Sequence, residues 1–260
     1  MKHRFLKILF ISFPLALAII LGVKWLTLRH MESALQEQLL MGEGKNVLVV
    51  GHSHGEDAIN DSILDNWANR CRSGEMMWGA YTVLENMIEN NKVDTVVVPM
   101  LDFVGYTDHG ITTQYLLYES TRMALASRSP ISDLCRLDAG AVASFYLTND
   151  LYTLTQPITV GAFENWDHHG MRLDLDDREA SLKAKGRTVT PAMPLAEYSL
   201  QTRYTSRIID LCHSHGITVV AMNYPKYHYD KYMDCTGVHQ YYNSLGDSVV
   251  IADYERFALP

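Results

Sequence analysis

Three short runs of β-branched and aliphatic residues constrain the fold of this chain more than any other feature. They are Asn46–Gly51, Val93–Pro99 and Ile217–Met222, and a shorter run, Val249–Ala252, follows near the end. None of them alternates between apolar and polar residues, as a strand with one solvated face does. We therefore predict strands that are buried on both faces, as in a parallel sheet.

Amphipathic helices are predicted between these strands. Apolar residues recur at helical spacing in three sets: Ile59, Ile63 and Trp67; Met77, Tyr81, Leu84 and Ile88; and Leu200, Tyr204, Ile208 and Leu211. His213 suits the negative end of the last helix, and Gly216 can end that helix in a left-handed conformation. Further helical stretches are predicted near 113–127 and 138–148. The alternation of strands and helices predicts an α/β fold, a three-layer α/β/α sandwich around a mainly parallel sheet.

The N-terminus has the pattern of a membrane signal. Residues 8–23 carry no charge and are mostly apolar, and Lys2, Arg4 and Lys7 precede them. A transmembrane helix needs about 20 apolar residues, and Trp25–Leu28 extends the run toward that length. Basic residues keep this end in the cytoplasm. The predicted parts are a cytoplasmic segment 1–7, an uncleaved single-pass anchor 8–28 in the inner membrane, a connector 29–44 and a domain 45–260 on the periplasmic side.

Charge and cysteine content narrow the functional classes. The chain has 22 basic and 30 acidic residues, and five of the basic ones lie in residues 1–30, where there is no acid. Residues 31–260 therefore carry a net charge of −13. Because so acidic a body repels phosphate backbones, we expect no nucleic-acid partner. Cys71, Cys135, Cys212 and Cys235 form no paired zinc motif, and the sequence allows either disulfides or buried thiols.

A serine lies where the first predicted strand meets a helix. The strand runs directly into Gly51-His52-Ser53-His54-Gly55. In a parallel sheet this position is at the carboxyl edge, where binding and catalytic sites form. Ser53 can act there as a nucleophile, with backbone N–H groups nearby to stabilise an oxyanion. Capping of the following helix accounts for a serine at this position equally well.

The segment Val47–Asp61, with its Gly-x-Ser-His and Ala-Ile-Asn-Asp motifs, resembles the first block of the SGNH/GDSL hydrolases. More narrowly, it is similar to a group of bacterial membrane-anchored proteins. The resemblance covers roughly 45–100 and 198–254, and it implies a flavodoxin-like fold that acts on esters. It implies that Ser53 is the nucleophile and that the backbone N–H groups of Ser53 and Gly74 line the oxyanion hole. The implied substrate is a lipid ester or an O-acylated envelope glycan, with no cofactor.

The chain departs from this family in three places. His52 stands where the family usually has Asp, and Leu101–Tyr106 offers no Asn after the strand that ends at Pro99. The family's Asp-x-x-His block, which supplies the base, is expected after the last strand. Since the sequence ends at Pro260, soon after Asp253, we expect the domain to lack this block. The histidines that can replace it or assist are His52, His54, His109 and His228.

Other interpretations stay open. Without a complete triad, the domain can be an inert envelope protein that binds a glycan or a protein partner. We predict no metal site, although His52, His54, Asp57 and Asp61 form a possible ligand set, with His109, His228 or Asp230 completing it.

Two further patterns concern the edges of the sheet. Tyr224 and Tyr227 lie at the expected ligand edge, where tyrosines can stack on sugars or pack as half-buried core residues. Asp210 and His213 also have Asp-x-x-His spacing. They end a helix that leads into a strand, so we expect them at the opposite edge from Ser53.

Overall fold

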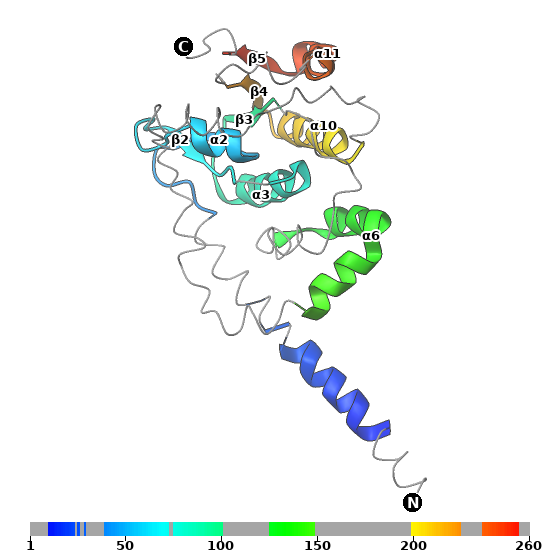
Figure 1. Cartoon of the computed structure of the whole chain (residues 1–260). Helices are drawn as coiled ribbons and strands as arrows, with labels where there is room; N and C mark the ends of the chain where they lie inside the picture. Colours follow the sequence, from blue (N-terminus) through cyan, green and yellow to red (C-terminus); the bar gives the residue numbers. More distant parts are fainter. Residues whose placement is uncertain are drawn as a thin grey trace, which may run out of the picture.

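Five parallel strands form the central sheet, in the order β2-β1-β3-β4-β5 (Figure 1). The structure is a computed structural model that describes residues 10–23, 25–26, 29, 39–72, 75–100, 125–148, 199–224 and 236–254. For Ser53, His54 and Asp57 it describes the backbone and not the side chain.

The strands confirm the predicted α/β class. They are β1 (Val47–Val49), β2 (Trp67–Asn69), β3 (Thr95–Pro99), β4 (Thr218–Asn223) and β5 (Val250–Asp253). All four predicted strands are present, whereas β2 was not predicted. Every pairing between neighbours is parallel. The strand order is that of flavodoxin-type sheets.

Apolar side chains are buried on both faces of the sheet, which explains why the strand sequences do not alternate. Leu48, Val96 and Val219 lie in the larger core, together with the helices on that face. Val49 and Val97 point to the other face, where a smaller core contains Ile59, Cys71, Met222 and Tyr224.

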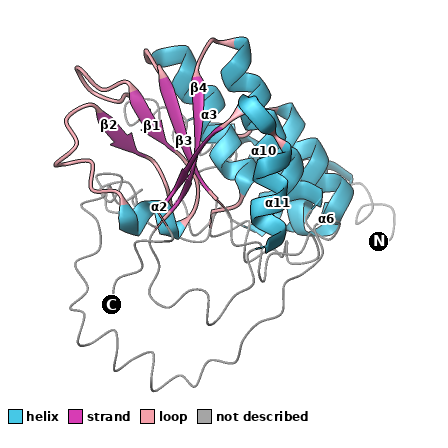
Figure 2. Cartoon of the chain, turned by 90° about the horizontal axis from the view of Figure 1, so that it is seen from above, coloured by secondary structure: helices cyan, strands magenta, loops and turns pink. Residues whose placement is uncertain are grey.

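Helices cover the larger core. α3 (Met77–Asn90), α10 (Ser199–Ser214) and α11 (Thr236–Ser244) lie on this face, and α6 (Arg128–Thr148) packs beside them (Figure 2). α3 and α10 match the predicted helices, and α11 was not predicted. The N-terminus of α3 has no cap of its own, and the buried Gln201 of α10 accepts a hydrogen bond from the Met77 N–H at 2.8 Å.

The helix predicted over 138–148 lies within α6. Backbone angles at Asp138 (φ −152°, ψ 86°) break α6 there, and Asp138 Oδ1 accepts the N–H of Ala141 at 2.8 Å. Asp138 therefore caps the second half of α6. The stretch predicted near 113–127 lies mostly outside the described residues.

On the second face, α2 (Ser53–Ala58) connects β1 to β2. From β1 the chain first adds β2 on one side of β1, through α2. It then adds β3, β4 and β5 on the other side of β1, with α10 and α11 on the opposite face of the sheet. Right-handed crossovers require this change of face when the direction along the sheet reverses.

The helix predicted through Ile59, Ile63 and Trp67 is wrong. α2 ends at Ala58, and Ile63 is 74% exposed. The side chain of Asn60 accepts hydrogen bonds from the backbone N–H and the hydroxyl of Ser62, at 3.0 and 2.6 Å. Such local bonds favour a turn over a helix. Trp67 then begins β2.

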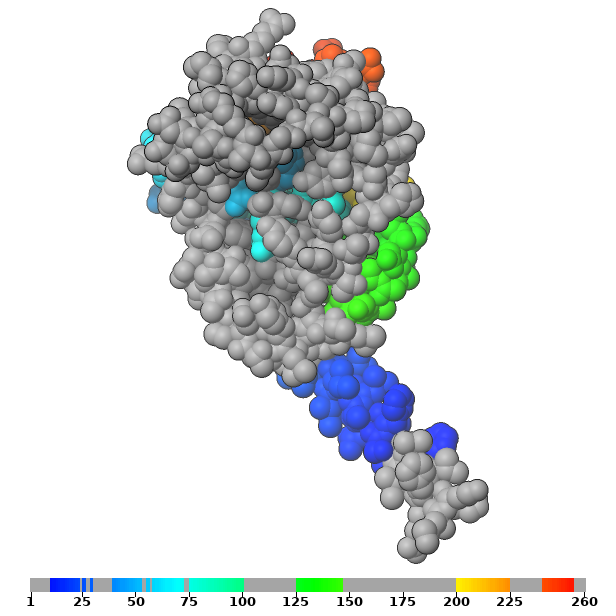
Figure 3. Space-filling view, in the orientation of Figure 1, coloured from blue at the N-terminus to red at the C-terminus, as the bar shows by residue number. Residues whose placement is uncertain are grey.

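Residues 10–23 form a helix (blue in Figure 3) whose apolar side chains are exposed, from Phe10 at 76% to Leu17 at 43%. Within the described part of the chain, no helix is long and apolar enough to cross a membrane.

Candidate functional site

Ser53 lies where the direction of the chain along the sheet reverses. β1 ends at Val49, the chain turns through Gly51 and His52, and α2 begins at Ser53. From β1 the chain crosses to β2 on one side and later returns to β3 on the other. In open α/β sheets the crevice at such a switch point, outside the carboxyl ends of the strands, is the usual ligand site.

Two glycines allow the turn around Ser53 to pack tightly. Gly51 has φ +139°, and a Cβ there would lie 2.5 Å from Cγ of Pro99. A Cβ on Gly55 would collide with the sulfur of Cys71. The five residues match Gly-x-Ser-x-Gly, a pattern in which glycines let a serine sit on a tight strand-to-helix turn. The spacing of the two glycines around Ser53 is visible in the sequence alone.

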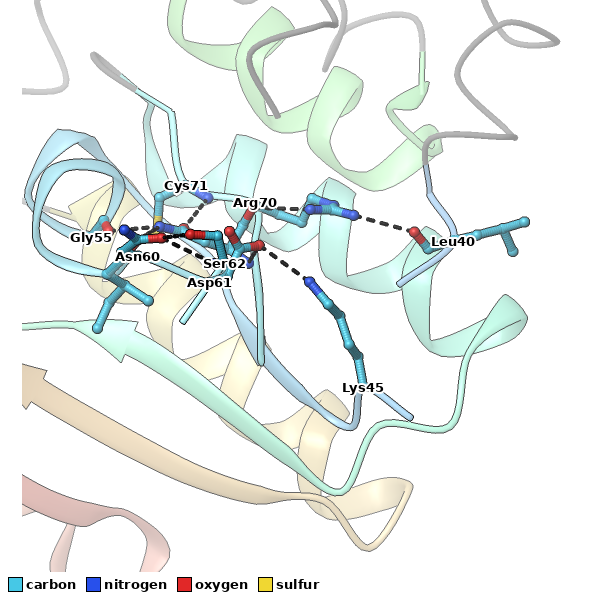
Figure 4. A network of polar contacts seen from close by, with 10 residues as sticks. Leu40, Lys45, Gly55, Asn60, Asp61, Ser62, Arg70 and Cys71 are labelled. Carbon is cyan, nitrogen blue, oxygen red and sulfur yellow. Dashed lines mark hydrogen bonds and ion pairs between the residues drawn. The ribbon is translucent and has the colours of Figure 1, made fainter. Parts of the chain in front are cut away.

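The buried Asn69 at the end of β2 holds α2 in place (Figure 4). Its Nδ2 donates to the carbonyl oxygens of Gly55 and Ile59, both at 2.9 Å, and its Oδ1 accepts the N–H of Cys71 at 3.0 Å. Its own N–H donates to Asp61 Oδ2 at 2.9 Å. Asn69 thus pairs the carbonyl of Ile59 just beyond α2 and adds a second bond to the carbonyl of Gly55, which also accepts the N–H of Ile59 at 3.2 Å.

Lys45 extends the same network, because its Nζ lies 3.6 Å from the buried Asp61 carboxylate. Figure 4 shows that Asp61, Arg70 and Cys71 reach this network from neighbouring segments of the chain. Asp61 ends the Ala-Ile-Asn-Asp motif of the sequence, whereas no motif identifies Asn69 as part of the network.

Further polar side chains are buried near the carboxyl ends of the strands. His52, Glu75 and Asn223 are each 3–4% exposed. Arg70 is 7% exposed, and its guanidinium donates to the carbonyl oxygens of Asn69 at 3.1 Å and Leu40 at 3.2 Å. Since buried polar groups destabilise a fold unless they are paired, their concentration at one edge is typical of a functional site.

The end of β5 joins this edge. Nδ2 of Asn223, the last residue of β4, donates to Oδ1 of Asp253 at 3.1 Å. Asp253 is the last residue of β5, so its carboxylate lies at the same edge of the sheet as the Ser53 turn. Asn223 and Asp253 were not among the predicted site residues, although each directly follows a predicted strand.

Tyr224 lies immediately after β4 and is only 4% exposed. Its ring belongs to the smaller core, and a Cβ on Gly55 would lie 3.3 Å from its hydroxyl oxygen. Burial, reinforced by Cys71, raises the pKa of this phenol well above its ordinary value. A role in stacking on sugars is therefore wrong for Tyr224, because its ring faces are covered. Tyr227 lies outside the described residues.

The other predicted site residues are described only in part. Gly74, His109, His228 and Asp230 lie outside the described residues, and His54 and Asp57 are known by their backbone in α2. Within the described ranges, no group of three or more His, Cys, Asp or Glu side chains can hold a metal ion. Cys71, Cys135 and Cys212 are free thiols.

His213 lies at the opposite edge of the sheet, as predicted. It lines an open cavity of about 540 Å³ together with Thr218 and Val250, the first residues of β4 and β5. Its Nε2 is 2.9 Å from the carbonyl oxygen of Ser248. The predicted left-handed stop at Gly216 is confirmed, with φ +69°.

Comparisons with models of known protein families, with curated proteins and with solved structures found no match to this chain.

Proposed function

We propose that this protein is a serine ester hydrolase or O-acyltransferase, with Ser53 as its nucleophile. The observation that carries the proposal is the Gly-x-Ser-x-Gly turn between β1 and α2, at the point where strand order reverses. The buried polar side chains that gather at the same edge support it. The resemblance of Val47–Asp61 to SGNH/GDSL hydrolases agrees with this chemistry and points to O-acyl groups of an envelope glycan or a lipid.

The reaction begins when Oγ of Ser53 bonds to the acyl carbon of the ester. The hydroxyl proton passes to an imidazole base and then to the leaving alkoxide, as the ester C–O bond breaks. Water, or an acceptor hydroxyl, then attacks the acyl-enzyme and releases Ser53. The candidate bases are His109 and His228, and His52 and His54 are possible accessory residues. The backbone N–H groups of Ser53 and Gly74 are the proposed oxyanion donors.

We also propose that residues 8–28 anchor the protein in the inner membrane, with the body on the periplasmic side. The exposed apolar side chains of the helix over 10–23 and the basic residues before it support this location. The body is proposed to be a three-layer α/β/α sandwich whose second helical layer starts with α2.

A fluorophosphonate probe tests the role of Ser53. We expect the full chain to be labelled and to hydrolyse p-nitrophenyl acetate, and we expect Ser53→Ala to lose both, by several orders of magnitude in rate. Ser214→Ala is the matched control, because Ser214 is an exposed serine at the other end of the sheet. Labelling that survives Ser53→Ala refutes the proposal. An inert wild type favours a glycan-binding role, and zinc-dependent activity favours the histidine site.

A further inference from the structure

Tyr224 holds a buried hydroxyl at the edge of the sheet that carries Ser53. Its ring packs with Val49, Val97 and Met222, and 4% of the residue is exposed. Among the residues that the structure describes, none pairs with this hydroxyl. A buried polar group without a hydrogen bond destabilises the folded state, and phenylalanine would fill the same space without that loss. A hydroxyl kept under these conditions points to a ligand.

The other deeply buried tyrosines behave differently. The hydroxyl of Tyr204 donates to Asp133 Oδ2 at 3.1 Å, and that of Tyr242 donates to the carbonyl oxygen of Pro99 at 3.4 Å. Both residues are fully buried. The fold therefore pairs the hydroxyls of tyrosines that serve only packing, and Tyr224 departs from this pattern at the candidate site.

The position of Tyr224 connects it to Ser53. It follows β4, and β3 separates β4 from β1 in the sheet. Its side chain nevertheless reaches α2, since its hydroxyl lies 3.3 Å from the place of a Cβ on Gly55. Gly55 follows Ser53 by two residues, within one turn of the same helix. The hydroxyl thus lies beneath the turn that carries the proposed nucleophile.

We propose that the Tyr224 hydroxyl is a hydrogen-bond donor to the carbonyl oxygen of the ester bound at Ser53, an inference that rests on the proposed function. When Oγ of Ser53 adds to the carbonyl carbon, the π electrons of the C=O bond move to oxygen, and the donated bond stabilises that charge. The residue of α2 that faces the hydroxyl is a glycine, so no side chain of that residue separates the hydroxyl from the start of α2.

The phenol keeps its proton throughout this reaction. Burial raises its pKa well above the ordinary value, with Cys71 acting in the same direction. Tyr224 therefore stays protonated at neutral pH, where it acts as a donor and takes no part in moving the proton of Ser53. Its contribution belongs to the transition state, where negative charge on the oxygen is largest, so its loss lowers kcat more than it changes KM.

Tyr224→Phe in the full chain, held in detergent, tests this inference. We expect kcat for p-nitrophenyl acetate to fall by about 10²- to 10³-fold, the usual effect of removing one oxyanion donor, with Tm unchanged or higher. Tyr204→Phe is the matched control, because it removes a hydroxyl that is paired with Asp133. We expect this control to lower Tm and leave kcat unchanged.

The outcomes separate the two proposals. Full kcat in Tyr224→Phe, with Ser53→Ala inactive, overturns the role of Tyr224 and leaves the proposed function intact. A fall in kcat together with a lower Tm assigns Tyr224 a structural role and also overturns it. Hydrolysis that survives Ser53→Ala overturns the proposed function itself.

Discussion

At the residue scale, the packing of Gly55 against Cys71 is the tightest constraint on the Ser53 turn. A methyl group on Gly55 would collide with the Cys71 sulfur, and the side chain of Asn69 bonds the carbonyl oxygen of Gly55. We expect Gly55→Ala to lower the free energy of unfolding by about 1–3 kcal/mol, as overpacking usually does. Chemical denaturation of the full chain measures the change.

A double-mutant cycle shows whether this loss is steric. Cys71→Ala removes the sulfur and leaves space for the new methyl group. We therefore expect the double variant Gly55→Ala/Cys71→Ala to be more stable than the sum of the two single effects predicts. Strict additivity would contradict the steric explanation.

Burial also makes the thiols unequal in reactivity. Burial raises the pKa of Cys212 to about 12, whereas Cys135 is half-buried on α6. Only the thiolate is a nucleophile, so a raised pKa keeps Cys212 unreactive until the pH approaches that value. We expect iodoacetamide at about pH 8, well below that pKa, to label Cys135 much faster than Cys212. Peptide mass spectrometry measures this, and equal rates in the folded protein would contradict it.

At the scale of elements, one buried carboxylate joins α6 to α10. Asp133 on α6 accepts hydrogen bonds from Arg207 Nη1 at 2.9 Å and from the Tyr204 hydroxyl at 3.1 Å, and Arg203 lies 3.5 Å away. Its removal leaves the Tyr204 hydroxyl buried without an acceptor, while the arginines are exposed enough to regain water. Asp133→Ala is expected to lower the free energy of unfolding by about 2–4 kcal/mol.

Asp138→Ala is the control on the same helix. It removes only the cap of the second half of α6, so we expect a smaller loss of about 1 kcal/mol. Thermal unfolding of the two variants compares them, and equal losses would argue against a special role for the Asp133 cluster.

The elements that the sequence predicted are those with long, regular patterns. α3 and α10 each bury a periodic apolar stripe, and β3 and β4 are uninterrupted apolar runs. β1 is as short as β2, but it lies in the apolar run Val47–Val50, whereas β2 (Trp67–Asn69) has polar neighbours on both sides and is defined by its pairing with β1.

The candidate site, like the fold, could be predicted from the sequence only in part. Ser53 follows from a local motif, since strand, turn and helix are continuous in sequence. The place of Tyr224 at the ligand edge was predicted, but its contact with α2 and the bonds of Asn69 to α2 could not be, because they join segments far apart in the sequence. The residues next to Tyr224 and Asn69 in the sequence do not indicate those contacts.

At the scale of the whole molecule, apolar surface is concentrated at one end. We expect the full chain to stay in the membrane pellet after a carbonate wash, through residues 8–28. The double variant Leu17→Arg/Ile20→Arg is expected to release it, because each arginine at the centre of a membrane helix costs about 2.5–3.5 kcal/mol. Ile63→Arg, an exposed apolar residue of the body, is the control and should leave the protein in the pellet. Release of the wild type by the wash would contradict the anchor.

The chain is fastened to the body before it enters the sheet, and this limits how far the Ser53 edge can lie from the proposed anchor. Asn91 Nδ2 donates to the carbonyl oxygen of Leu39 at 2.7 Å, and Asn91 Oδ1 accepts the N–H of Met41 at 2.8 Å. The guanidinium of Arg70 donates to the carbonyl oxygen of Leu40 at 3.2 Å. With the proposed anchor at 8–28, only residues 29–38 are left as a tether, which is at most about 35 Å long when fully extended. The Ser53 edge would then stay within a layer a few nanometres deep next to the lipid surface. Esters on membrane lipids, or on glycans still attached to those lipids, lie within that layer, and more distant parts of the envelope lie outside it.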